Sequence, residues 1–357
     1  MKIYNKTINK YLAAILFTSI LATACEKRLD VFPTSSISDS KALLSEGDVL
    51  VTLIGTYDGA QAATVYGGDI MVLNELIGNG ENINFTGTFA GLSDAFKAQM
   101  TANNGNATGT WGSSYSTINR ANNVLSALDK VTSSATKKSS VEGEALFLRG
   151  SLYFELVKLF AKPVGDGDYA ANPGVPLVLT PTGNVSEADY KARATVKAVY
   201  DQVIADLTKA ESLLPSSNTI YATKWSAAAQ LSRVHLALKN YTEAGAAANR
   251  VIVGSGKTLT AEFRNNWFTY INFGGVTPNE YVFYIKVTNQ DGANSFNTYY
   301  GAPLGAFPGS AGRRDMRIQN AHLNIYETGD IRRALLNGCK ISDNIRKIKS
   351  KKNYIAV

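Results

Sequence analysis

The stretch TKWSAAAQLSRVHLALKNYTEAGAAANRVIV, residues 223–253, decides the fold of this chain. Alanine and larger apolar residues recur at helical spacing in both of its halves, 223–238 and 243–253. Such spacing places the apolar side chains along one face of a helix. The residues between the halves, Lys239-Asn240-Tyr241, predict a turn. The stretch therefore predicts two helices that pack against each other as a pair.

This helix pair resembles a tetratricopeptide unit. The resemblance rests on Ser232 and His235 in the first helix and on Ala244 and Ala248 in the second. Small side chains at a helix contact let the two backbones approach closely. About three such units are normally needed for a stable stack, so other helix pairs of the chain are expected to complete it.

Three longer blocks also carry an apolar stripe at helical spacing. They are Trp111 to Leu128, Glu142 to Phe160, and Val196 to Leu214, the last with Thr195 as a plausible N-cap and Pro215 as its stop. Two more helices are expected between Lys41 and Ile77, broken at Gly67-Gly68, and the best strand candidate is Tyr281 to Val287. The expected fold is mainly α, built of tetratricopeptide-like helix pairs with loop-rich, small-β excursions.

The N-terminus predicts export and a lipid anchor. Three lysines precede a short apolar run that ends in Leu21-Ala22-Thr23-Ala24-Cys25. This is the pattern of a signal peptide, residues 1–24, and the run is too short to span a bilayer as a helix. Ala24 before Cys25 resembles the lipobox of bacterial lipoproteins, so Cys25 is the predicted lipidation site and 25–40 a tether. The alternative is a secreted protein with an incidental cysteine.

Charge and cysteine content exclude two classes of protein. The net charge is +7, but the basic excess lies in the signal peptide and beyond Asp330. The body between Cys25 and Asp330 holds 25 basic and 28 acidic residues. A nucleic-acid partner, which needs a basic face on the folded domain, is therefore not expected. With Cys25 lipidated, Cys339 has no partner, so disulfides do not hold this fold.

Two loop-rich segments offer aromatic residues for binding a ligand. The first, Gly78 to Gly109, and the second, Trp267 to Phe307, place aromatic rings among asparagines. Sugar rings have apolar faces and a rim of hydroxyl groups, which suit an exposed aromatic ring flanked by amides and carboxylates. The candidate ligand-binding residues are Phe85, Phe89, Asn104, Trp267, Tyr299 and Tyr300. For each aromatic, packing in the core is the alternative.

Catalytic and metal signatures are lacking. The two histidines, His235 and His322, are far apart in sequence, and neither HExxH nor GxSxG occurs. Ser134-Ala135-Thr136-Lys137 matches a Ser-x-x-Lys pattern without its companion motifs. No catalytic residue, metal ligand or cofactor is predicted. A pair of carboxylates for glycoside hydrolysis depends on folding and stays open.

An ordered set of segments resembles the SusD/RagB family of outer-membrane nutrient-binding lipoproteins. The segments are Trp111 to Leu125 with Arg120-Ala121-Asn122, Glu142 to Phe154, Leu156 to Phe160, Gly174 to Leu177, Val196 to Leu207, Ala222 to Ala228, Asn279-Glu280, and Gly329 to Arg333. The resemblance implies a helical domain over 41–333 and a lipid anchor in the outer membrane, facing the cell exterior.

The same resemblance implies a function without catalysis and without a cofactor. Family members lie as a lid over a SusC-like, TonB-dependent outer-membrane transporter and present glycans or peptides to it. The chain departs from the family after Gly338, where a lysine-rich run leads to Val357. We therefore expect a C-terminally truncated or frameshifted member whose helical domain is incomplete, with 334–357 as a basic, aberrant tail.

Two other functions compete with this one. A helical-repeat envelope lipoprotein would act through protein–protein contacts alone. A lipid-anchored glycoside hydrolase would turn its ligand over. Binding of a glycan or peptide without turnover would distinguish the nutrient-binding function from both of these alternatives.

Overall fold

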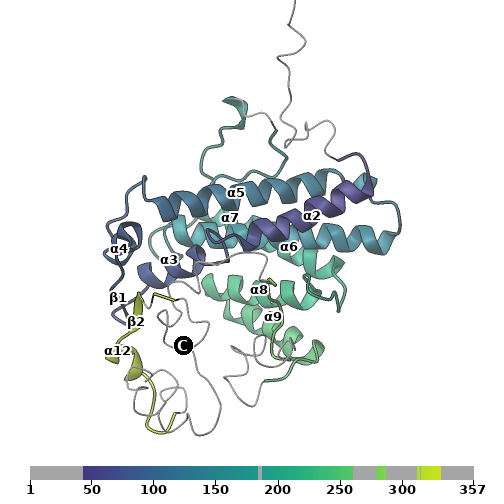
Figure 1. Ribbon diagram of the computed structural model, residues 1–357. Helices are drawn as coiled ribbons and strands as arrows, with labels where there is room; N and C mark the ends of the chain where they lie inside the picture. Colours follow the sequence, from purple (N-terminus) through teal and green to yellow (C-terminus); the bar gives the residue numbers. More distant parts are fainter. Residues whose placement is uncertain (1–42, 184–186, 260–278, 287–311, 314, 331–357) are drawn as a thin grey trace, which may run out of the picture. The chain divides into compact units, whose positions relative to one another are not determined.

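The chain divides into two units, Met1–Leu44 and Ser45–Val357, of which the second is described below. A computed structural model describes residues 43–183, 187–259, 279–286, 312–313 and 315–330 (Figure 1). The expected signal peptide, the tether with Cys25 and the basic tail lie outside the described residues. The proposed boundaries of these segments therefore stay predictions.

The described residues are mainly helical, which confirms the predicted fold class. The helices are α2 (Glu46–Gln61), α3 (Asp69–Ile77), α4 (Ala90–Phe96), α5 (Gly105–Ser126), α6 (Ala135–Phe160), α7 (Val196–Leu213), α8 (Lys224–Ala237), α9 (Tyr241–Gly254) and α12 (Asn320–Leu323), with short 3-10 turns η2 (Leu128–Lys130) and η3 (Glu187–Asp189). The strands are β1 (Ile83–Phe85) and β2 (Met316–Ile318).

Side-chain caps set where several helices begin. The predicted cap Thr195 is confirmed, since its hydroxyl accepts a hydrogen bond from the Ala198 backbone N–H at 3.1 Å. Ser134 caps α6 in the same way through Lys137, so this helix begins at Ala135, seven residues before the expected start. Residues 135–138 are exposed, and Val141 is the one large apolar residue among the seven added, so this part of the helix carries no apolar stripe.

The long helices form a stack in chain order. α2 packs on α5, and each helix from α5 to α9 packs on the next (Figure 1). α6 is buried along most of its length because it lies between α5 and α7. Gly143 allows α6 to approach the end of α7, since a Cβ there would lie 2.8 Å from the Leu214 side chain. The α8–α9 pair confirms the helix pair predicted from residues 223–253.

A two-stranded antiparallel sheet lies at one end of this stack, beside α3 and α4 (Figure 1). Ile83 pairs with Ile318 and Phe85 with Met316. The inner face of the sheet joins a small apolar core. That core contains Val72, Leu73, Leu76, Phe85, Leu92, Ala95 and Met316. The sheet therefore connects residues near position 85 with residues more than 200 positions later.

The strand predicted at Tyr281–Val287 is wrong over its described part, 281–286, which has no strand structure. One of its aromatic side chains packs on a helix instead. The Phe283 ring contacts the Phe147 ring of α6 edge to face, with centroids 5.0 Å apart.

Candidate functional site

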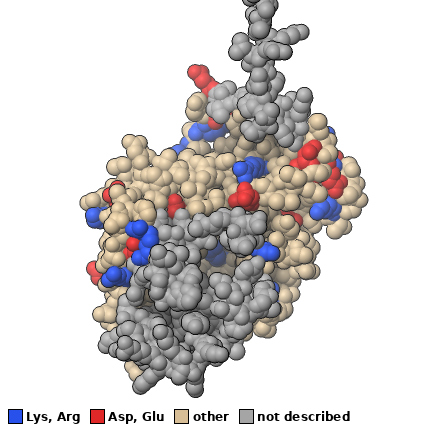
Figure 2. Space-filling model, in the orientation of Figure 1, with Lys and Arg blue, Asp and Glu red and all other residues tan. Residues whose placement is uncertain are grey.

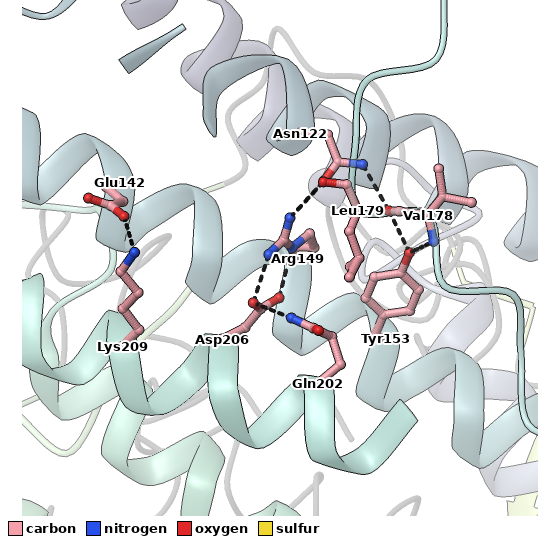
Figure 3. Close-up of polar contacts among 9 residues, drawn as sticks. All are labelled: Asn122, Glu142, Arg149, Tyr153, Val178, Leu179, Gln202, Asp206 and Lys209. Carbon is pink, nitrogen blue, oxygen red and sulfur yellow. Dashed lines mark hydrogen bonds and ion pairs between the residues drawn. The ribbon is translucent and has the colours of Figure 1, made fainter. Parts of the chain in front are cut away.

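A buried polar network joins α5, α6 and α7 (Figure 3). The Arg149 guanidinium donates two hydrogen bonds to the Asp206 carboxylate, at 2.8 Å and 2.7 Å. Its Nη1 donates to Asn122 Oδ1 at 2.9 Å. Both charged side chains are less than a tenth exposed. This is the geometry of a bidentate buried ion pair, which is strong only because each group keeps its partners.

The same network also holds residues 178–182, a segment without helix or strand that lies between α6 and α7 in the chain. Asn122 Nδ2 donates to the carbonyls of Val178 and Thr180, and Asn119 donates to that of Thr182. The Tyr153 hydroxyl donates to the Val178 carbonyl and accepts from its N–H, each at 2.8 Å (Figure 3). The Arg149–Asp206–Asn122 part of the network is buried and its side chains hold one another and the backbone, so these side chains are used within the fold.

Of the two candidate aromatics that the structure describes, Phe89 lies at the surface. It precedes α4 directly and its side chain is 42% exposed. The Arg313 guanidinium lies over the Phe89 ring, 4.4 Å from the centroid. An arginine in this position gains from the negative face of the ring. Phe89 and Arg313 therefore form a stacked pair at the surface.

Two further side chains fix the orientation of Arg313. Its Nε donates to Asp315 Oδ2 at 2.8 Å, and its Nη2 donates to the Thr88 hydroxyl at 2.9 Å. Asp315 is itself buried beside the small core. Gly87 permits this arrangement, because a Cβ there would lie 2.6 Å from the Asp315 carboxyl carbon. We define Thr88, Phe89, Arg313 and Asp315 as the Phe89–Arg313 cluster.

Asn104 supports the cluster indirectly, by joining the start of α4 to the start of α5. Its Oδ1 accepts from the Ala107 N–H as the N-cap of α5, and its Nδ2 donates to the Gly91 carbonyl at 2.8 Å. The side chain is buried. Asn104 thus ties the first turn of α4 to the start of α5, which fixes the helix that Phe89 begins. Its amide is used within the fold.

Phe85 is buried, at 8% exposure, in the small apolar core. For this residue the core alternative holds, because the pairing of β1 with β2 turns its side chain inward. The other candidates, Trp267, Tyr299 and Tyr300, lie outside the described residues. Sequence reasoning missed Thr88, Arg313 and Asp315. No local pattern joins them, since 225 positions separate Thr88 from Arg313.

The described residues hold no group of three or more histidine, cysteine, aspartate or glutamate side chains that could bind a metal ion. His235 lies within α8, and His322 in α12 lies 3.2 Å from the Tyr326 hydroxyl. In the part of the chain that the structure describes, every helix is too short or too polar to cross a membrane.

Comparison with known proteins identifies the scaffold. The profile of the SusD-like family described as "starch-binding associating with outer membrane" matches residues 29–236. SusD-like protein P2 from Formosa agariphila is 24% identical over 263 residues, which are 72% of this chain and 50% of the relative. SusD-like protein P38 from the same organism is 27% identical over 258 residues, 71% of this chain and 47% of the relative. The chain thus spans about half the length of these relatives.

Solved structures share the fold. A SusD superfamily protein from Bacteroides vulgatus aligns with a TM-score of 0.69 at 21% identity, covering 82% of this chain and 65% of the other. A laminarin-binding SusD-like protein aligns with a TM-score of 0.52 at 21% identity, covering 64% of this chain and 49% of the other. At these identities the likeness concerns the arrangement of the backbone.

Proposed function

Because the chain belongs to the SusD-like family of starch-binding proteins that associate with the outer membrane, we propose that it binds a glycan at the cell surface without catalysing its cleavage. The observation that supports this most is the Phe89–Arg313 cluster. An aromatic ring at the surface can stack on the apolar face of a sugar. Hydrogen-bonding groups beside the ring, here Arg313 and Thr88, can meet the hydroxyl rim.

The binding role needs a rigid support, and the fold supplies one. Asn104 fixes the helix that begins after Phe89, and Asp315 fixes Arg313. A preorganised site loses less conformational entropy when its ligand binds. Trp267, Tyr299 and Tyr300 remain proposed as further aromatic contacts from the second loop-rich segment.

We further propose that Cys25 carries the lipid that anchors the protein in the outer membrane, facing outward. The glycan would then pass to a SusC-like, TonB-dependent transporter beside it. The apolar run before Cys25 and the family of the chain support this proposal. The lipid anchor is tested by labelling with a fatty acid, which should be lost in Cys25→Ala. The transporter partner is tested separately, by its co-purification with the protein.

Glycan binding is tested by isothermal titration of neutral oligosaccharides, laminarin and starch fragments among them, into the protein. Phe89→Ala is expected to weaken binding about tenfold, or about 1.4 kcal/mol. Tyr190→Ala is the matched control, because this tyrosine is 76% exposed and directly follows η3, away from the cluster in the chain. The proposal fails when the protein binds no glycan, when it binds peptides instead, or when both variants weaken binding equally.

A further inference from the structure

Arg313 keeps hydrogen-bond donors that no residue in the described part of the chain uses. The guanidinium carries five N–H groups. Nε donates to Asp315 and Nη2 donates once, to Thr88. Nη1 donates no hydrogen bond to any residue that the structure describes, and the side chain is 39% exposed. The edge formed by Nη1 and Nη2 is therefore available to a ligand.

The unused edge is held in a fixed direction. The guanidinium carbon lies over the Phe89 ring, and Asp315 holds the group through Nε, on the side away from Nη1. The planar fork of an arginine matches the paired oxygens of a carboxylate, sulfate or phosphate group. The Asp315 side chain is only 8% exposed, so it orients Arg313 while presenting little negative charge to the surface.

A second arginine adds positive charge to the same small sheet. Arg317 is exposed and lies opposite Asn84 in the register of β1 and β2. Phe85 and Met316, the next pair along, point into the core, so Asn84 and Arg317 point to the outer face. Arg317 has no ion pair within the described residues. Arg317 therefore adds an exposed positive charge to the outer face of this sheet, and the exposed Glu81 lies just before β1.

This local charge is not a property of the whole surface. The body of the chain holds slightly more acidic than basic residues. Figure 2 shows Lys and Arg interspersed with Asp and Glu over the described part of the visible face, without one large patch of either sign. A neutral sugar would need hydrogen-bonding groups beside the ring, but it would not need the full positive charge that Arg313 places there.

We infer that the glycan bound at the Phe89–Arg313 cluster is acidic, and that its carboxylate or sulfate group is bound by the Nη1–Nη2 edge of Arg313. The inference rests on the proposed function, because it names the class of glycan that this site takes. Phe89 contributes the apolar contact, Arg313 the charge-assisted hydrogen bonds, and Arg317 a further attraction.

The test compares short oligosaccharides of equal length with the full chain carrying Cys25→Ser, which removes the lipid acceptor. The probes are maltohexaose, which is neutral, hexagalacturonate, which carries carboxylates, and a sulfated maltohexaose. Titrations are run at about 150 mM salt, where the Debye length of about 8 Å suppresses long-range attraction to the basic ends of the chain. One or both acidic probes are expected to bind at least tenfold more tightly than maltohexaose.

The variants assign that preference to a residue. Arg313→Gln is expected to remove it, whereas Lys138→Gln, which deletes one exposed positive charge in α6, is expected to keep it. The inference is overturned when neutral and acidic probes bind equally, or when the preference survives Arg313→Gln; glycan binding itself would then stand. Absence of binding to every probe would overturn the proposed function and the inference with it.

Discussion

The buried pair Arg149–Asp206 allows a sharp test of how the helical stack is held together. The side chains are 8% and 3% exposed, and Arg149 also donates to Asn122. Arg149→Met leaves the Asp206 carboxylate buried with one donor, Gln202 Nε2 at 2.8 Å. Removing one partner of a buried ion pair typically costs about 3–5 kcal/mol, because the remaining charge is uncompensated.

A matched control lies nearby on the same two helices. Lys209 of α7 pairs with Glu142 of α6 at 2.5 Å, but its side chain is 58% exposed (Figure 3). Water and salt screen such a pair, so Lys209→Met is expected to cost about 0–1 kcal/mol. The double variant Arg149→Met with Asp206→Leu removes both buried charges. It should recover most of the loss, since no unpaired charge remains.

The assay is urea unfolding followed by circular dichroism at 222 nm. With a slope of about 3 kcal/mol per molar urea, the loss in Arg149→Met corresponds to a midpoint lower by about 1–1.7 M. Lys209→Met should shift the midpoint by less than about 0.3 M on the same slope. Equal shifts in the two single variants, at unchanged slope, would refute the reasoning that burial sets the strength of the pair.

Three further predictions follow from single side chains. Phe85→Ala should destabilise the fold by about 3–5 kcal/mol, because it opens a cavity in the small core, whereas Phe89→Ala should cost under about 1 kcal/mol; urea midpoints distinguish them. Asn104→Ala should lower the free energy of unfolding by about 1 kcal/mol, because the N-cap is lost. Asn104→Asp keeps the cap but cannot donate to the Gly91 carbonyl, so its urea midpoint should lie between those of Asn104→Ala and the wild type. An Asp variant as unstable as the Ala variant would contradict the role of the cap. Burial raises the pKa of Glu144 above its ordinary 4.5, so the folded state holds that proton more tightly than the unfolded state. The stability linked to this proton is therefore complete below pH 4.5 and is lost as the pH rises through the pKa of the folded state. Glu144→Gln should flatten this fall in urea midpoints measured from pH 4 to 8, and an unchanged slope would assign it to another group.

The sequence predicted what is encoded locally. The cap at Thr195 lies next to the helix that it begins, and the apolar stripe lies within that helix. The same reasoning placed a loop over Gly78–Gly109, where the structure has β1, α4 and the start of α5. These elements are short, and their stability comes from packing against α3 and β2 rather than from their own pattern.

The candidate site could be predicted only in part, for a physical reason. Phe85 and Phe89 lie four residues apart in similar composition, yet one is buried and the other is at the surface. The difference arises from β2, more than 200 residues later, which turns Phe85 inward by pairing with β1. Asn104 likewise has the right chemistry for a sugar contact, but the start of α5 uses its amide.

The residues that identify the family and those proposed to select its ligand are different residues. Arg149 and Asn122 belong to segments that carry the family resemblance, and both are buried in the network that supports the helices. The family profile ends at residue 236, before Arg313 and Asp315. A scaffold can stay constant while its binding residues change. Relatives with the same helical stack could therefore bind different glycans, and the ligand of this chain has to be sought through Arg313 rather than through family membership.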